Sequence, residues 1–302
     1  MDVRRAAFGD LPGAGVWGAA RGGGVEERWL AAVVLGGQGH YAAAATVLGG
    51  LIGGGGLFGS LAASTLASHR RQLGGHASAR RWDALALALL ADRGEKGVEE
   101  DPDGVDVAGA RADALLGLAA DAVGAGRVGE ARRLHERVEP LGWRSRVRHQ
   151  WVAAEIELAD GHAERAVAPA ERAAALSGEA GATRHALKSD LVLGTTLVVL
   201  GTPAGLDRGL DLLHCDLNHT DQLGLLSLIW PTGLVLANAQ ENRTYADGQN
   251  VKERTQNALS CVLRRADPIG RRLAHRSPWV PTALLRSGEP PNADPEANFL
   301  TD

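Results

Sequence analysis

The sequence has few of the residues that stabilise small secreted domains or carry redox chemistry. Among its 302 residues there are two cysteines, Cys215 and Cys261, and one methionine, and aromatic residues make up only 4%. Two cysteines cannot build a disulfide framework. The sequence therefore predicts a protein of a reducing compartment, the cytoplasm.

Long apolar runs are also missing. The most apolar segment, 223–239, is interrupted by Ser227, Pro231, Thr232 and Asn238, and it falls short of the ~20 apolar residues that a membrane-spanning helix needs. The N-terminus, which reads MDVRRAAFGDLPGAGVWGAARGGG, lacks the continuous apolar core of a secretory signal peptide. We therefore expect no membrane partner.

Strand patterns and a strong positive charge are equally scarce. The β-branched residues stand in alanine-rich surroundings rather than in alternating runs, which favours an all-α fold. The formal net charge of -4 argues against a nucleic-acid partner. The abundance of alanine, glycine and arginine over lysine is typical of a high-GC genome, such as that of an actinobacterium.

What the chain does contain is a repeated pattern: an apolar helical segment, a turn glycine and an alanine-rich helix start. The glycines of the pattern are Gly39, Gly75, Gly126 and Gly161, with a looser copy at Gly201. The residue seven positions before each glycine is always small: Ala32, Ser68, Ala119, Ala154 and Gly194. A small residue there lets the two helices of a hairpin approach closely, so the pattern predicts stacked helical hairpins.

The pattern resembles the tetratricopeptide repeat (TPR) family, whose unit is about 34 residues long. The first copy matches best, with Leu35-Gly36 followed by Gly39-His40-Tyr41 and then Ala44. The resemblance covers roughly residues 25–215, with a sixth hairpin expected between 223 and 265. It implies an all-α, right-handed helical-repeat solenoid of five or six TPR-like hairpins.

The chain departs from the family at two features. The large apolar residue usual near the start of each first helix is replaced by Arg28, Ser64 or Gln150, and the step from Gly75 to Gly126 is long. The resemblance thus predicts hairpins but not a regular superhelix.

The organisation expected along the chain has three parts. Residues 1–24 are predicted to be a flexible N-terminal arm, and 25–287 the solenoid, with an acidic loop at 92–106 and a C-terminal cap. The tail, 288–302, is rich in proline and acidic residues and is expected to be extended. A solenoid needs a cover for its last apolar face, and Trp279, between two prolines, is predicted to fill that role.

The resemblance also implies a concave groove lined by fixed positions of each first helix. At those positions, the side chains able to hold a peptide are Trp29, His69, Gln72, Arg148, Trp151 and Glu155. Asp113 also falls at such a position, but its neighbours are apolar and it is not included. The predicted function is a scaffold or adaptor that binds a protein or peptide without catalysis or cofactor, with self-association as an alternative.

Two other functions stay open. His214, Cys215 and His219 could form a metal- or cysteine-dependent enzyme site, although two histidines five residues apart lie about 140° out of phase on a helix. The competing interpretation is a loop in which Asn218 or Asp216 caps a helix. The remaining alternative is a small-ligand sensor that uses the solenoid interior and regulates through protein contacts.

Two further motifs have structural interpretations. The glycine run 53–59 contains a G-x-G-x-x-G, but a helical pattern precedes it, so a linker is expected rather than a nucleotide site. The arginine-rich segment 127–148 could dock an acidic partner. The competing interpretation is a solvated helix face with internal pairs such as Arg132–Glu136.

Overall fold

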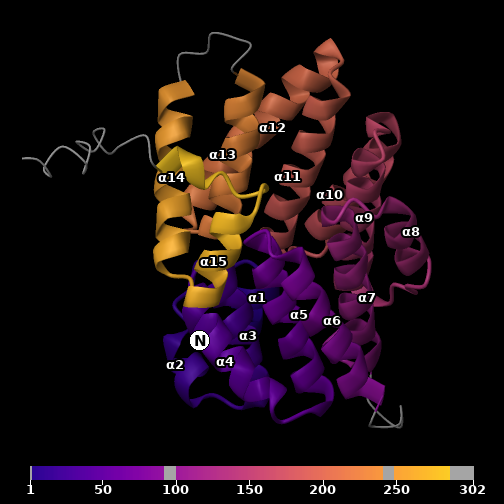
Figure 1. Cartoon of the computed structure of the whole chain (residues 1–302), viewed down its shortest axis with the longest axis vertical. Helices are drawn as coiled ribbons and strands as arrows, with labels where there is room; N and C mark the ends of the chain where they lie inside the picture. The colour runs from indigo at the N-terminus through magenta and orange to yellow at the C-terminus, as the bar shows by residue number, and fades with distance from the viewer. Residues whose placement is uncertain (1, 92–99, 241–247, 286–302) are drawn as a thin grey trace, which may run out of the picture.

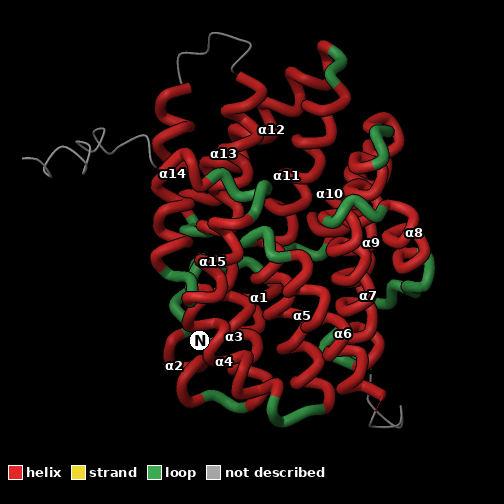
Figure 2. Tube along the Cα trace, in the orientation of Figure 1, coloured by secondary structure: helices red, strands yellow, loops and turns green. Residues whose placement is uncertain are grey.

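The computed structural model describes residues 2–91, 100–240 and 248–285 (Figure 1). Throughout these ranges the regular structure is helical, with fifteen α-helices, one 3₁₀ helix and no strand (Figure 2). The all-α prediction is confirmed. None of the described helices combines the length and the apolar character needed to cross a membrane.

Twelve of the helices pair in chain order as six hairpins. The pairs are α3 (Val25–Gly37) with α4 (Tyr41–Ile52), α5 (Gly56–Gln72) with α6 (His76–Ala91), α7 (Val107–Gly124) with α8 (Val128–His135), α9 (Gly142–Ala159) with α10 (Ala163–Glu179), α11 (Thr183–Leu200) with α12 (Pro203–Gln222), and α13 (Leu226–Gln240) with α14 (Gly248–Arg264). The other helices are α1 (Val3–Phe8), α2 (Trp17–Gly22), α15 (Pro268–Arg276) and the 3₁₀ helix η1 (Thr282–Leu285).

The turn glycines adopt the left-handed backbone conformation that favours glycine. Gly39, Gly126, Gly161 and Gly201 have φ angles of 79°, 71°, 79° and 70°. In the second hairpin, however, the residue with a positive φ is Gly74, at 72°, and not Gly75. The alignment from sequence was therefore wrong by one residue in that hairpin.

The corrected register restores the small-residue pattern in the second hairpin. It replaces Ser68 by Ala67 at the close approach, and Ala67 is fully buried. In the other hairpins Ala32, Ala119 and Ala154 are also fully buried. A close approach of paired helices is thus a shared property of the repeats.

Residues 1–24 do not form a flexible arm, so that prediction was wrong for the residues described. They form α1 and α2, and Phe8 is 6% exposed. The Asp2 carboxylate caps α1 by accepting from the backbone N–H groups of Arg4 and Arg5. Gln38, the C-cap of α3, donates to the carbonyl oxygens of Pro12 and Ala14, at 3.0 and 2.9 Å. Contacts with the repeats therefore order a segment that is too short to be a stable helix alone.

The C-terminal helices pack back on the first two hairpins (Figure 1). Arg70 in α5 donates to both oxygens of Asp267, the N-cap of α15, at 2.8 and 2.6 Å. The backbone N–H of Ala42 in α4 donates to the carbonyl oxygen of Arg265, at 2.8 Å. The array of hairpins therefore closes on itself, whereas the sequence predicted an open groove.

The cap differs in detail from its prediction. Val280 is 3% exposed and lies against the second hairpin near Gly74, whereas Trp279 is 59% exposed. Val280 therefore fills the place expected for Trp279.

The predicted acidic loop is described only in part. Residues 100–106 form a turn, while residues 92–99 and the tail lie outside the described residues.

The close approach in the fifth hairpin predicts an unusual response to a small substitution. A Cβ atom on Gly194 would lie 2.6 Å from Cγ of Leu213 in α12, so we expect Gly194→Ala to lower the free energy of unfolding by about 1–3 kcal/mol through overpacking. The matched control is Gly49→Ala in α4, where a Cβ would meet nothing within 4 Å. It should stabilise the protein by about 0.5–1 kcal/mol. Urea denaturation measures both, and a Gly194→Ala variant as stable as wild type would contradict the close packing.

Candidate ligand-binding site

The inner helices line a cavity of about 370 Å³. Its wall takes residues from the first helix of every hairpin, namely α3, α5, α7, α9, α11 and α13, and from α1 and the segment 279–280. The second helices contribute none of the lining residues. A volume of this size lies within the range of about 300–1,000 Å³ found for small-molecule pockets.

Aromatic side chains close one side of the cavity. The ring of Phe8 in α1 lies 5.8 Å from that of Trp29, 6.4 Å from Trp143 and 6.2 Å from His185, measured between centroids. Trp151 stacks on His185, with centroids 5.6 Å apart and planes inclined by 13°. The N-terminal helix is therefore part of the cavity wall.

All six residues predicted for the groove line this cavity: Trp29, His69, Gln72, Arg148, Trp151 and Glu155. Two of them are mostly covered. Trp29 is 1% exposed and donates from Nε1 to the hydroxyl of Thr65 at 3.0 Å, and His69 is 5% exposed. Binding by these residues stays a prediction.

The other four predicted residues all have polar partners. Gln72 accepts a hydrogen bond from the hydroxyl of Tyr41 at 2.5 Å, and Trp151 donates from Nε1 to Ser189 at 2.8 Å. Arg148 donates to Asp113 at 2.5 Å, and Glu155 lies 3.7 Å from Lys188. The cavity thus has an ordered polar lining.

The cavity histidines are neutral. Burial, reinforced by the nearby charges of Arg184 and Arg70, lowers the pKa of His69 to about 3. Burial and the arginines Arg184, Arg144 and Arg148 hold the pKa of His185 well below its usual range. The positive charge of the cavity therefore comes from arginine and lysine.

Two of these arginines share one carboxylate. Arg144 and Arg148 donate to the two oxygens of Asp113 at 2.6 and 2.5 Å. Arg144 also donates to the carbonyl oxygens of Asp103 and Gly104, at 2.8 and 2.9 Å. The three side chains together carry one positive charge in excess.

Arg71 stands between two carboxylates. It donates to Asp83 at 2.5 Å and to Asp121 at 2.8 Å. Burial, together with the charge of Asp121, raises the pKa of Asp83 to about 8 against the opposing effect of Arg71. Arg71 is therefore fully paired within this group.

Arg184, near the start of α11, is the cavity arginine without an acidic partner in the described part of the chain. No carboxylate there pairs with it, and its buried Nε has no hydrogen-bond partner. Burial, followed by the charges of Arg148 and Arg144, lowers its pKa to about 10. Among the described residues, the carboxylate of Asp113 is therefore the only one that offsets the positive charges of Arg144, Arg148 and Arg184.

Sequence reasoning missed several of these residues. The register that placed the groove in the first four hairpins would also have given Lys188 and Leu191 if carried to the fifth, and both line the cavity. Arg184 and His185 lie in the first turn of α11, before the segment that the repeat pattern covers. Phe8 lies in the segment expected to be an arm.

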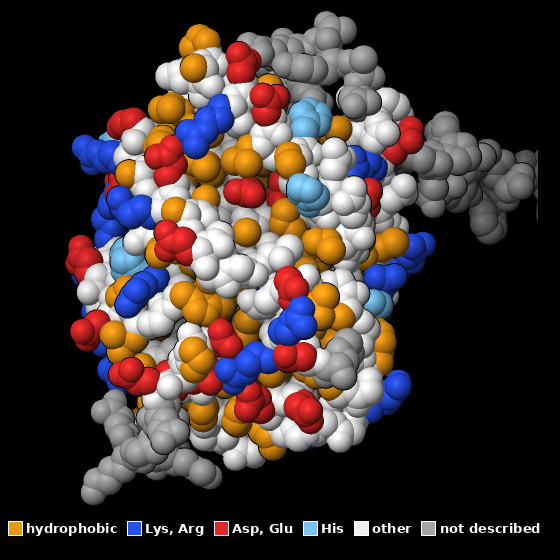
Figure 3. All heavy atoms as spheres, turned by 180° about the vertical axis from the view of Figure 1, so that it is seen from behind, with side chains coloured by type: hydrophobic (Ala, Val, Ile, Leu, Met, Phe, Trp, Pro, Cys, Tyr) orange, Lys and Arg blue, Asp and Glu red, His pale blue; other side chains and the backbone are white. Residues whose placement is uncertain are grey.

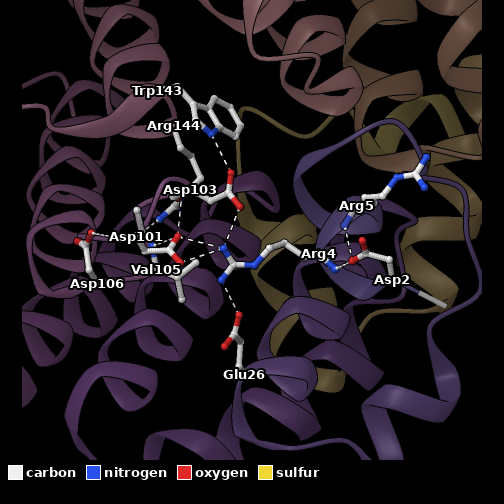
Figure 4. Close-up of polar contacts among 11 residues, drawn as sticks. Asp2, Arg4, Arg5, Glu26, Asp101, Asp103, Val105, Asp106, Trp143 and Arg144 are labelled. Atoms are coloured by element: carbon white, nitrogen blue, oxygen red, sulfur yellow. Dashed lines mark hydrogen bonds and ion pairs between the residues drawn. The ribbon is translucent and has the colours of Figure 1, made fainter. Parts of the chain in front are cut away.

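The N-terminal helix is attached by one arginine (Figure 4). Arg4 reaches Glu26 of α3 at 2.6 Å, and Asp101 and Asp103 of the segment before α7 at 2.9 and 3.0 Å. Asp103 also accepts from Nε1 of Trp143 at 2.9 Å. The attachment of α1 is therefore coupled to α9, which carries Arg144 and Arg148 into the cavity.

The candidate enzyme cluster lies elsewhere. His214 to Asp221 belong to α12, so the loop expected there is wrong and Asn218 caps no helix. Sγ of Cys215 lies 3.7 Å from Nδ1 of His219 on an exposed face. Nowhere in the described ranges do three His, Cys, Asp or Glu side chains gather closely enough to hold a metal ion.

The arginine-rich segment is divided between surface and cavity. Arg132 pairs with Glu157 of α9 and with its C-cap, Asp160, rather than with Glu136. Arg144 and Arg148 line the cavity. On the face shown in Figure 3, acidic, basic and apolar side chains are interspersed. The uncompensated positive charge therefore distinguishes the cavity from this surface.

The glycine run 53–59 spans the α4–α5 turn and the start of α5.

No protein-family model matches this chain, and no curated protein matches it in sequence. The lining of the cavity is therefore the basis for any functional inference.

A buried carboxyl group in α12, next to the candidate enzyme cluster, gives a pH-dependent prediction. Asp216 is 2% exposed and accepts from Thr232 at 2.9 Å, and burial with the nearby Asp190 raises its pKa to about 7. The folded protein keeps a proton here that the unfolded chain loses near its ordinary pKa of 3.8, so stability falls as the pH rises from about 4 through 7.

Asp216→Asn should remove that contribution. Because one pKa unit corresponds to about 1.36 kcal/mol, the variant should gain stability relative to wild type, by an amount that grows as the pH rises through 7. Urea denaturation across this pH range measures the difference. A difference that does not change with pH would contradict the raised pKa.

Proposed function

We propose that this protein is a non-catalytic binding protein whose central cavity receives a small ligand. The observation that carries the proposal is the closure of the helical array around a cavity of about 370 Å³, lined by all six inner helices. An open solenoid offers an extended surface to a partner, whereas a closed one offers a pocket of small-molecule size.

The hairpins are proposed to be TPR-like and wound in a right-handed sense. In this interpretation the ligand contacts every repeat, because each hairpin contributes its first helix to the cavity wall. A ligand that binds only the folded, closed form stabilises that form. Ligand binding would then change the conformation of the second helices, which lie outside the cavity wall, and so alter contacts with other proteins, as in a small-ligand sensor.

The polar lining supports binding rather than catalysis. Asp113 is held by two arginines, Glu155 lies beside Lys188, and His69 and His185 are buried neutral rings. Aromatic faces and arginine forks are well suited to hold a ligand in place.

A second candidate is the peptide-binding function predicted from the sequence, and the position of α1 favours it. This segment already lies against the concave face, with Phe8 on Trp29 and Arg4 between three carboxylates. A partner peptide that displaced α1 would gain access to Trp29.

A cavity-filling variant tests the first candidate. Ala120 lines the cavity and is half-buried, so Ala120→Phe should occupy the ligand's place and abolish binding. Protein purified from the cells that make it would be examined by native mass spectrometry, and released small molecules would be identified. The wild type and the control Ala175→Phe, on the exposed face of α10, should carry the same bound mass. Wild-type protein without a bound mass, or a mass retained by Ala120→Phe, would contradict the proposal.

Loosening α1 tests the second candidate. Arg4→Gln removes the charge that holds Glu26, Asp101 and Asp103 together, so amide hydrogen exchange in residues 3–8 should become faster. Affinity capture from lysate should then recover more of a peptide-bearing partner with Arg4→Gln than with wild type. Adding Arg148→Ala and Trp151→Ala should abolish that recovery. Equal recovery by all three proteins would exclude a groove hidden by α1.

A further inference from the structure

We propose that the ligand of the central cavity carries a negatively charged group, a carboxylate or a phosphate, which binds to Arg184 beside Arg148. The inference rests on the proposed function, since it names the chemistry that the same cavity would recognise. It is based on the balance of charges, the unused donors and the place of Arg184 in the wall.

The charges in the cavity wall do not balance. Arg144 and Arg148 have only Asp113 between them, and Lys188 is matched by Glu155. Arg184 adds a further positive charge for which the described residues supply no carboxylate. These six side chains therefore carry two positive charges in excess, in a place where an uncompensated charge is costly.

Hydrogen-bond donors are also left over at the same place. Arg144 uses all three of its guanidinium nitrogens, on Asp113 and on two carbonyl oxygens. Arg148, in contrast, uses one nitrogen, on Asp113, and none of the described residues accepts a hydrogen bond from Arg184. Planar guanidinium forks with free donors match the oxygens of a carboxylate or phosphate.

The structure keeps Arg184 in the cavity wall. Its aliphatic chain lies against α3, where a Cβ on Gly37 would meet Cδ of Arg184 at 3.1 Å. The N–H of the preceding residue, Thr183, donates to the carbonyl oxygen of Gly9 at 3.1 Å, which ties the start of α11 to the end of α1. The aromatic rings of Trp151 and Phe8 border the same space. They would accept the apolar part of an anionic ligand.

The first test uses the ligand-free protein. Arg184→Met keeps most of the side-chain volume and removes the unbalanced charge, so we expect its melting temperature to exceed that of wild type. Arg208→Met is the control, because Arg208 is exposed and paired with Glu171 at 2.8 Å, and it should not raise the melting temperature. An Arg184→Met variant that melts at or below wild type would contradict an uncompensated charge in the cavity.

The second test uses paired probes that differ in charge. Benzoate and phenyl phosphate should bind wild type and raise its melting temperature, while the uncharged benzamide should not. Calorimetry should show at least about tenfold weaker anion binding for Arg184→Met, an intermediate loss for Arg184→Lys, and wild-type affinity for Arg208→Met. Tighter binding of benzoate would identify a carboxylate ligand, and tighter binding of phenyl phosphate a phosphate monoester.

The outcomes separate this inference from the proposed function. If benzamide binds as tightly as benzoate and Ala120→Phe blocks both, the cavity is a ligand site and the anion inference is wrong. If anions bind equally well to wild type, Arg184→Met and Ala120→Phe, they bind outside the cavity and the inference is again wrong. If no probe binds in a way that Ala120→Phe changes, the small-ligand function and the inference fail together.

Discussion

The close approach of paired helices is the constraint on which the rest of the structure depends. The first five hairpins place a small residue where their two helices meet, as at Ala32, Ala67 and Gly194. This spacing keeps the hairpins thin, so that six of them stack with their first helices on one side. A larger residue at one of these sites would separate the two layers and move the inner helix that carries the cavity side chains.

Closure of the array converts a surface into a site. The Arg70–Asp267 pair joins residues 197 positions apart in the chain, and Val280 covers the same region. Charges that would be solvated in an open groove become partly buried, where their mutual interactions strengthen. The cavity and its excess positive charge are therefore consequences of closure and not of any single repeat.

The sequence predicted the hairpins because their determinants are local. A turn glycine and a small residue at a fixed distance recur in every copy, and periodicity shows them directly. It could not decide between Gly74 and Gly75, since adjacent glycines differ only in backbone conformation. Despite this one-residue error in the register of α5, His69 and Gln72 line the cavity, because a wide cavity contacts neighbouring positions on the same helix. Closure, and the order of α1, depend on contacts between distant segments that carry no repeated pattern.

The excess positive charge of the cavity also gives a role to the residues of the site that the repeat pattern does not predict. Arg184 precedes the segment that matches other copies, and Phe8 lies outside the repeats, yet both border the space beside Arg148. An unpaired arginine in a largely enclosed site destabilises the protein that contains it, whereas a bound anion would offset that cost through charge-assisted hydrogen bonds. The stability of the closed form would then depend on the ligand, and α1, which joins the start of α11 through Gly9, would respond to its presence.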